Sequence, residues 1–246
     1  MSIEQRQRRL LAFEGCYNAR DLGGYHTRDG RETRWGAVVR ADNLARLTPA
    51  GRRSLQEYGV RRVIDLRKPE ELEMHPNPFA ATGTHGVDFV NISLVDPAVT
   101  PSEAFTTLAN DYKRIVDSFA PSIAEIMMSI ARAPEGTVLI HCHAGKDRTG
   151  IISAMLLDLA GVPEDVIAAD YALTAECNRK LEDDWLENGP GEREWRVQEQ
   201  AKYVPHAYVM RELLDHVRQR YGGTEPYLLQ AGVPETDIAQ LRDRLL

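Results

Sequence analysis

Apolar residues along this chain of 246 residues follow two spacings. Three segments rich in β-branched residues predict strands: "VRRVIDLR" from Val60, "GVDFVNISLV" from Gly86 and "TVLIHC" from Thr137. Apolar positions spaced three or four residues apart predict helices over 48–59, 121–133 and 151–159. Because short strands alternate with helices, the pattern favours an α/β fold with a mostly parallel central sheet flanked by helices.

Turn and capping residues refine these boundaries. Asp29-Gly30 predicts a hairpin turn, followed by a strand over 35–39. Thr48 is a suitable N-cap for the first helix, and Gly59 is a suitable stop. A capping box that begins at Thr100 predicts the start of another helix.

Composition narrows the class of protein. A formal net charge of −7 gives no general attraction to nucleic acid or to an anionic membrane, so any anion site must be locally basic, and we expect no nucleic-acid partner. The three cysteines cannot all pair within the chain, which favours a reducing compartment. Without the apolar run of a signal peptide or of a membrane span, the cytoplasm is the default location, with secretion by a signal-less route left open. No linker divides the chain, so residues 1–246 are expected to form one domain.

The segment from Cys142 to Thr149 lies between a predicted strand and a predicted helix. In a parallel sheet, ligands gather at the carboxyl ends of strands. The free N–H groups and the dipole at a helix start favour an anion, and Arg148 adds a planar fork of donors that matches phosphate oxygens. The same positive field stabilises a thiolate. The spacing therefore predicts a phosphate site with Cys142 as its nucleophile.

Other chemistries fit these residues less well. Cys16 and Cys177 have no such surroundings and are expected to be inert packing residues. His141 and His143 flank the cysteine, but in a strand Cys142 would face the side opposite both histidines, and the sequence offers no second cluster of ligands, so no metal is expected. A nucleotide-binding P-loop is excluded because the Gly-x4-Gly-Lys-Ser/Thr pattern is absent. We expect no cofactor.

The sequence "HCHAGKDRT" from His141 to Thr149 resembles the signature loop of the cysteine-dependent protein-tyrosine phosphatase superfamily. Its Gly-Lys-Asp-Arg-Thr portion is similar to that of bacterial triple-specificity phosphatases, which act on phosphotyrosine, on phosphoserine or phosphothreonine, and on phosphoinositides. Further similar segments are "NARDLGGY", "WGAVVRADNL", "VIDLR" and "YGGTEPYLLQAGV". The resemblance covers most of the chain and implies a protein-tyrosine-phosphatase-like fold.

The resemblance also implies roles for individual residues. Cys142 would attack phosphorus, while Arg148 and the loop amides would hold the phosphate oxygens. Thr149 would donate a hydrogen bond to the leaving sulfur, and His141 would brace the loop. The phosphate-binding segment comprises His143, Ala144, Gly145, Lys146, Asp147 and Arg148.

The general acid has two candidates. The triple-specificity group points to Asp147, within the loop, whereas many other relatives use an aspartate on a separate loop, a position that Asp96 could fill. Beside a phosphate dianion, a carboxylate favours its protonated form, as an acid requires. Asp21, Asp65 and Arg67 are expected to support the pocket.

The charged segment 179–203 contains two tryptophans and a Gly-Pro-Gly break, and it resembles a region where relatives carry a lid. A solvated helical excursion is the alternative.

We expect a phosphotyrosine phosphatase with secondary activity on phosphoinositides, because Lys146 offers an ammonium group to a second phosphate. Phosphoinositides as the main substrate, and a catalytically inactive phosphate-binding module, are the alternatives. An arsenate reductase or a rhodanese-like enzyme is disfavoured by the histidine before Cys142 and the Arg-Thr pair that ends the loop. The oligomeric state is left open.

Overall fold

The computed structural model of the protein describes residues 3–81, 86–95 and 107–246. Its centre is a five-stranded sheet in the order β1-β2-β5-β3-β4. The short β1 pairs antiparallel with β2, and the other neighbouring strands run parallel. The expected α/β fold with a mostly parallel sheet is therefore confirmed. The strands are β1 (Arg20–Asp21), β2 (Val38–Ala41), β3 (Val60–Asp65), β4 (Asp88–Asn91) and β5 (Thr137–His141).

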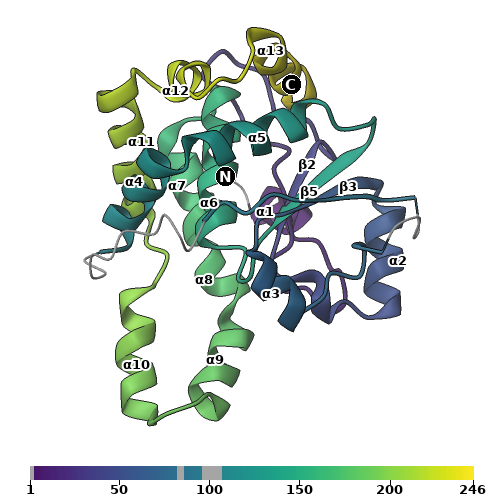
Figure 1. Ribbon diagram of the computed structural model, residues 1–246, viewed down its shortest axis with the longest axis vertical. Helices are drawn as coiled ribbons and strands as arrows, with labels where there is room; N and C mark the ends of the chain where they lie inside the picture. The colour runs from purple at the N-terminus through teal and green to yellow at the C-terminus, as the bar shows by residue number, and fades with distance from the viewer. Residues whose placement is uncertain (1–2, 82–85, 96–106) are drawn as a thin grey trace.

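Helices cover both faces of this sheet (Figure 1). They are α1 (Ile3–Arg9), the 3₁₀ helix η1 (Leu44–Arg46), α2 (Pro49–Glu57), α3 (Pro69–Met74), α4 (Leu108–Ser118), α5 (Ala120–Ala131), α6 (Asp147–Leu159), α7 (Glu164–Ala172), α8 (Thr174–Cys177), α9 (Arg179–Asn188), α10 (Arg193–Lys202), α11 (Ala207–Tyr221), α12 (Thr224–Gln230) and α13 (Glu235–Leu245).

Alternation along the strands builds two apolar layers. Val138 and Ile140 of β5 pack in the larger core with α4 to α7 and α11 to α13. Between them, Leu139 points to the opposite face and belongs to the smaller core, which also contains Leu55 of α2. Because β5 is buried on both faces, it reads as a continuous apolar run, which is typical of a central parallel strand.

The structure confirms one helix and one turn that capping and turn residues predicted. The Thr48 hydroxyl accepts a hydrogen bond from the Gly51 N–H at 3.1 Å, and Gly59 ends the helical segment with a φ of +99°. The helix predicted over 48–59 is thus confirmed. The turn at Asp29-Gly30 is also confirmed by an antiparallel bridge between His26 and Glu32.

Two boundaries differ from the sequence prediction. The strand expected over 35–39 is β2, which begins only at Val38, because Gly36 adopts a φ of +70° in a turn. The helix expected over 151–159 begins at Asp147, since its polar first turn is invisible to an apolar pattern. The capping box predicted at Thr100 lies outside the described residues, and the next described helix, α4, begins at Leu108.

Helices α9 and α10 pack side by side and project together from the body, at the bottom of Figure 1. The nearly buried Arg196 joins them, because its guanidinium donates to the carbonyls of Leu186 at 2.8 Å and Gly189 at 2.7 Å. A cation at these carbonyls satisfies and stabilises the C-terminus of α9. In the part of the chain that the structure describes, no helix is long and apolar enough to cross a membrane.

Candidate active site

The loop that follows β5 lies at the carboxyl edge of the sheet, between the ends of β2 and β3. Cys142 is its first residue, and only 2% of its surface is exposed. Gly145 adopts a φ of +62°, and a Cβ there would lie 2.4 Å from the Ala41 carbonyl oxygen. Only glycine fits this close approach, which lets the loop curl back over the end of β2.

Three consecutive carbonyl groups of the loop point outward. The carbonyl oxygens of His143, Ala144 and Gly145 each accept a hydrogen bond from outside the loop. Because C=O and N–H point in opposite directions across a trans peptide, the N–H groups of the following residues face the interior of the loop. The result is an anion-binding cradle. The outer donors are the Asn43 N–H at 3.0 Å, the side-chain amides of Asn18 and Asn178 at 2.9 Å, and the Arg40 guanidinium at 2.7 Å.

A buried cluster behind the loop holds Arg40 in place. Asp170 of α7 lies between two arginines, 2.7 Å from Arg40 and 3.1 Å from Arg20, and all three side chains are essentially inaccessible. Burial opposes ionisation of Asp170, but the two guanidinium groups hold its pKa well below the usual range. The Asp170 carboxylate is therefore charged. It holds Arg40 in the position from which Arg40 binds the Gly145 carbonyl of the loop.

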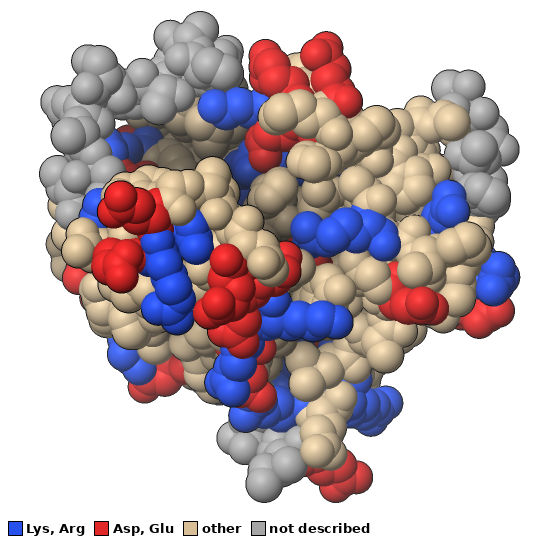
Figure 2. Space-filling model, turned by 90° about the horizontal axis from the view of Figure 1, so that it is seen from below, with Lys and Arg blue, Asp and Glu red and all other residues tan. Residues whose placement is uncertain are grey.

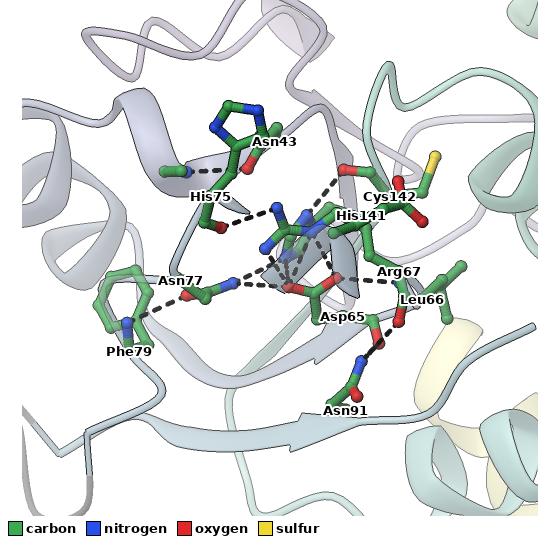
Figure 3. A network of polar contacts seen from close by, with 12 residues as sticks. Asn43, Asp65, Leu66, Arg67, His75, Asn77, Phe79, Asn91, His141 and Cys142 are labelled. Carbon is green, nitrogen blue, oxygen red and sulfur yellow. Dashed lines mark hydrogen bonds and ion pairs between the residues drawn. The ribbon is translucent and has the colours of Figure 1, made fainter. Parts of the chain in front are cut away.

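A second network connects β3 with the residue before Cys142 (Figure 3). The Asp65 carboxylate lies 3.2 Å from His141 Nε2 and 2.7 Å from the Arg67 guanidinium, and it accepts a hydrogen bond from Asn77 at 3.1 Å. Burial opposes ionisation here too, yet His141 and Arg67 keep the pKa of Asp65 well below its usual range. His141 Nδ1 in turn lies 3.1 Å from the Cys142 carbonyl oxygen. The network thus fixes the backbone at Cys142.

Arg148, in the first turn of α6, forms a bidentate ion pair with Glu71 of α3. Although burial opposes the charge, Glu71 and the nearby Cys142 raise the pKa of Arg148. The guanidinium therefore lies close to the cysteine and is charged. A fork of this kind can bind the oxygens of a phosphate group.

Asp147 and Thr149 flank this arginine. One carboxylate oxygen of Asp147 accepts a hydrogen bond from the Tyr112 hydroxyl at 2.6 Å. The Thr149 hydroxyl is buried and has no hydrogen-bond partner among the described residues. A buried hydroxyl without a partner is costly, and this one is available to donate to a group that enters the site.

A cavity of about 530 Å³ lies between the loop and the α9–α10 pair. The Lys146 ammonium donates to the Tyr203 carbonyl at 3.0 Å, at the end of α10, and thereby joins the loop to this pair. Trp185 and Trp195 pack together with ring centroids 6.3 Å apart. The residues that line the cavity are Arg46, His143, Ala144, Lys146, Asn178, Leu181, Glu182, Asp184, Trp185, Trp195, Glu199, Gln200, Tyr203 and Val204.

The residues expected to support the pocket lie in different places. Asp65 and Arg67 lie beneath the loop, as described above. Asp21 lies near the amino end of β2, where its carboxylate accepts hydrogen bonds from the N–H groups of Gly23 and Gly36. Asp21 therefore stabilises a turn and does not support the pocket. Asp96 lies outside the described residues.

The other two cysteines differ from Cys142 in their surroundings. Burial and the neighbouring Asp42 raise the pKa of Cys16, and burial raises the pKa of Cys177. Both therefore favour the unreactive thiol form, in agreement with the packing role expected for them.

Sequence reasoning missed most of the residues that hold the loop from outside. Asn18, Arg40 and Asn43 fall within the segments "NARDLGGY" and "WGAVVRADNL", whose resemblance to the family was the available signal. No local sequence signal indicated Glu71 or Tyr112, because their roles depend on contacts with residues far away in the sequence.

The surface around the α9–α10 end carries interspersed charges. Seen from below, Lys and Arg side chains alternate with Asp and Glu, and neither sign covers the face alone (Figure 2). Attraction of an anion to this face therefore depends on individual basic side chains and not on a continuous positive surface.

Comparison with known proteins agrees with this geometry. The profile of the tyrosine phosphatase family matches residues 11–246, so the chain belongs to this family and is a phosphatase that hydrolyses phosphorylated substrates. It is 36% identical over 219 residues to a tyrosine-protein phosphatase of Nostoc commune, covering 85% of this chain and 74% of that protein. It is also 28% identical over 186 residues to the triple specificity protein phosphatase PtpB of Mycobacterium tuberculosis, covering 64% of this chain and 66% of that protein.

Proposed function

We propose that the protein hydrolyses phosphotyrosine through a cysteinyl-phosphate intermediate formed on Cys142. The observation that carries this proposal is the cradle itself: three loop carbonyls are held outward, so that the amides face the space above the cysteine. Arg148, whose two terminal nitrogens donate to Glu71, adds a guanidinium oriented by that ion pair. Such a site stabilises the negative charge that shifts over the equatorial oxygens in the transition state.

In the first step, the Cys142 thiolate attacks phosphorus in line and a sulfur–phosphorus bond forms as the phosphorus–oxygen bond breaks. Asp147 gives its proton to the leaving oxygen. In the second step, water attacks the intermediate, inorganic phosphate leaves, and the thiolate returns. The water's proton passes back to Asp147.

Two residues assist the cysteine. The Thr149 hydroxyl, which has no hydrogen-bond partner in the described part of the chain, donates to the sulfur when the thiolate leaves in the second step. His141, held by Asp65, fixes the backbone at Cys142 so that the sulfur faces the cradle. Both are roles in which a small change of position would lower the rate.

The general acid is Asp147 in this proposal. Its position at the start of α6, next to Arg148, and the partial exposure of its side chain support this role. Asp96 is the competing candidate. The two are distinguished by Asp147→Asn and Asp96→Asn, because only loss of the true acid removes the descending limb of the pH–rate profile for alkyl phosphates.

The α9–α10 pair acts as the lid over the substrate, within a single phosphatase domain. Its tryptophans and Tyr203 give the cavity an aromatic wall next to the loop, which suits an aryl leaving group. The lid stays linked to the loop through Lys146 and Tyr203.

Phosphoserine, phosphothreonine and phosphoinositides are secondary substrates. The name of PtpB gives that relative a triple specificity, and this chain carries Lys146 within its cradle. A phosphoinositide offers this ammonium a second phosphate that phosphotyrosine lacks.

A substrate panel tests the proposal. Phosphotyrosine, phosphoserine and phosphothreonine peptides are compared with phosphoinositide vesicles, using the unmodified chain, Cys142→Ser and Arg148→Lys. We expect phosphotyrosine to be the best substrate, Cys142→Ser to lose turnover but still bind vanadate, and Arg148→Lys to be severely impaired. A faster rate on phosphoinositides would make them the main substrate. Absence of turnover on every substrate would support a phosphate-binding module.

A further inference from the structure

A chain of two tyrosine hydroxyls ends on Asp147. Tyr112 of α4 lies 2.6 Å from Asp147 Oδ1, and the hydroxyls of Tyr112 and Tyr171 lie 2.7 Å apart. Both tyrosines are 1% exposed. Helices α4, α6 and α7 therefore each contribute one residue to this chain of hydrogen bonds.

The direction of this chain follows from the protonation of its members. Burial and the neighbouring Asp147 raise the pKa of both tyrosines above the ordinary value, so they keep their protons at any pH used for assay. Since Tyr112 gives its only proton to the carboxylate, Tyr171 must donate to Tyr112. Each hydrogen bond polarises and strengthens the next.

We propose that Tyr112, supported by Tyr171, is a positioning residue for the general acid. It fixes Oδ1 of Asp147, so that Oδ2 carries the transferable proton toward the leaving oxygen. This inference rests on the proposed role of Asp147 as the acid. It adds two residues that no part of the loop pattern contains.

Only one proton moves in this step. Asp147 loses the proton on Oδ2 to the leaving oxygen and becomes a carboxylate, while both tyrosines keep theirs. The hydrogen bond from Tyr112 strengthens as this charge forms, because bonds to ionised acceptors are stronger than bonds to neutral ones. It therefore stabilises the transition state more than the ground state.

Two cations also face Asp147. Lys146 Nζ lies 3.8 Å from the carboxylate, and the guanidinium of the adjacent Arg148 interacts with it electrostatically. Both remain when Tyr112 or Tyr171 is changed to phenylalanine. A difference between these variants and the unmodified chain thus reports on the hydroxyls.

The test is the pH–rate profile on an alkyl phosphate, such as a phosphoserine peptide, for Tyr112→Phe and Tyr171→Phe. Losing the donor favours the protonated carboxyl, so the descending limb should move to higher pH, by about one unit for Tyr112→Phe and less for Tyr171→Phe. The plateau rate should fall roughly three- to tenfold, because the acid is weaker and less well oriented. On an activated aryl phosphate the plateau should change little.

Tyr227→Phe is the matched control. Its hydroxyl is also buried, but it donates to the Val116 carbonyl at 2.8 Å and has no contact with Asp147 among the described residues. We expect its limb and plateau to match those of the unmodified chain. A merely structural role for Tyr112 would lower stability without moving the limb.

Asp147→Asn separates this inference from the proposed function. If the limb disappears in Asp147→Asn but stays in place in Tyr112→Phe, the acid assignment stands and the role of Tyr112 is refuted. If Asp147→Asn retains the limb, the acid assignment fails and the inference falls with it. Should Tyr112→Phe not fold, Tyr171→Phe decides: a limb shifted to higher pH supports the chain of hydroxyls, and an unmoved limb overturns it.

Discussion

The guanidinium of Arg148 is bound by the carboxylate of Glu71 through two hydrogen bonds, 2.6 and 3.0 Å long. Glu71 also accepts the Lys68 N–H at 3.0 Å and so caps the helix that carries it. Although burial opposes it, the ion pair with Arg148 lowers the pKa of Glu71 to about 2. The pair is therefore intact at any pH at which the enzyme is assayed, and Arg148 is oriented before substrate arrives.

Glu71→Gln should lower kcat/KM by roughly tenfold, because an amide offers one acceptor where the guanidinium fork needs two. The loss should appear on aryl and alkyl phosphates alike, since both need the same oxygens held. Glu70→Gln, an exposed neighbour on α3, is the control and should retain full activity. Equal rates for Glu71→Gln and Glu70→Gln would show that the ion pair does not prepare the arginine.

Asp170→Asn should destabilise the protein by about 3–5 kcal/mol, because it leaves the buried Arg20 and Arg40 without their counter-ion. Urea unfolding measures this loss. Arg40 would also hold the Gly145 carbonyl less firmly, so vanadate binding by the folded fraction should weaken. Asp165→Asn, on the exposed side of the same helix, should change neither quantity. An unaltered unfolding free energy for Asp170→Asn would contradict the proposed counter-ion role.

Stability should decrease in acid. Asp65 and Asp170 have pKa values lowered by folding, so the stabilisation they give is present above the unfolded pKa of roughly 4 and is lost as the pH falls toward the folded values. Urea unfolding at a series of pH values should show the free energy of unfolding falling below about pH 4. A constant free energy between neutral pH and pH 3 would mean that neither carboxylate has the surroundings described.

Lys146→Met should lower the phosphoinositide rate more than the phosphotyrosine rate, by about 1–2 kcal/mol of transition-state stabilisation if one contact to the second phosphate is lost. In the protein without substrate, the Lys146 ammonium donates a hydrogen bond to the Tyr203 carbonyl. The second phosphate must therefore replace this hydrogen bond. Lys180→Met, which removes the same charge from the exposed side of α9, controls for general attraction to anionic vesicles. An equal loss on both substrates would show that Lys146 only shapes the loop and lid.

The sequence predicted the elements whose signals are local. Thr48 and Gly59 bound α2 correctly, because a cap and a stop act within one turn. The strand and helix around Cys142 were placed by their own apolar spacing. The helix start at Asp147 was missed because the first turn there is polar and contributes nothing to an apolar pattern.

The contacts that hold the Cys142 loop in place could not be predicted from local sequence signals. Asp21 and Asp65, each followed by a leucine, were both expected to support the pocket, yet Asp65 holds His141 while Asp21 holds the turn at Gly36. The difference depends on the sheet order, which puts β3 directly beside β5 and leaves β1 at the edge. Contacts such as Arg40 with Gly145 join residues that are 105 positions apart and leave no local pattern.

The covalent step on Cys142 is the centre of this account, and an acid quench during turnover tests it most directly. A phosphotyrosine peptide is mixed with excess enzyme, the reaction is stopped within the first turnover, and the digested protein is analysed by mass spectrometry. We predict one added phosphoryl group on the peptide that contains Cys142, and none in Cys142→Ser. Rapid turnover without that adduct, together with undiminished hydrolysis by Cys142→Ser, would contradict the mechanism.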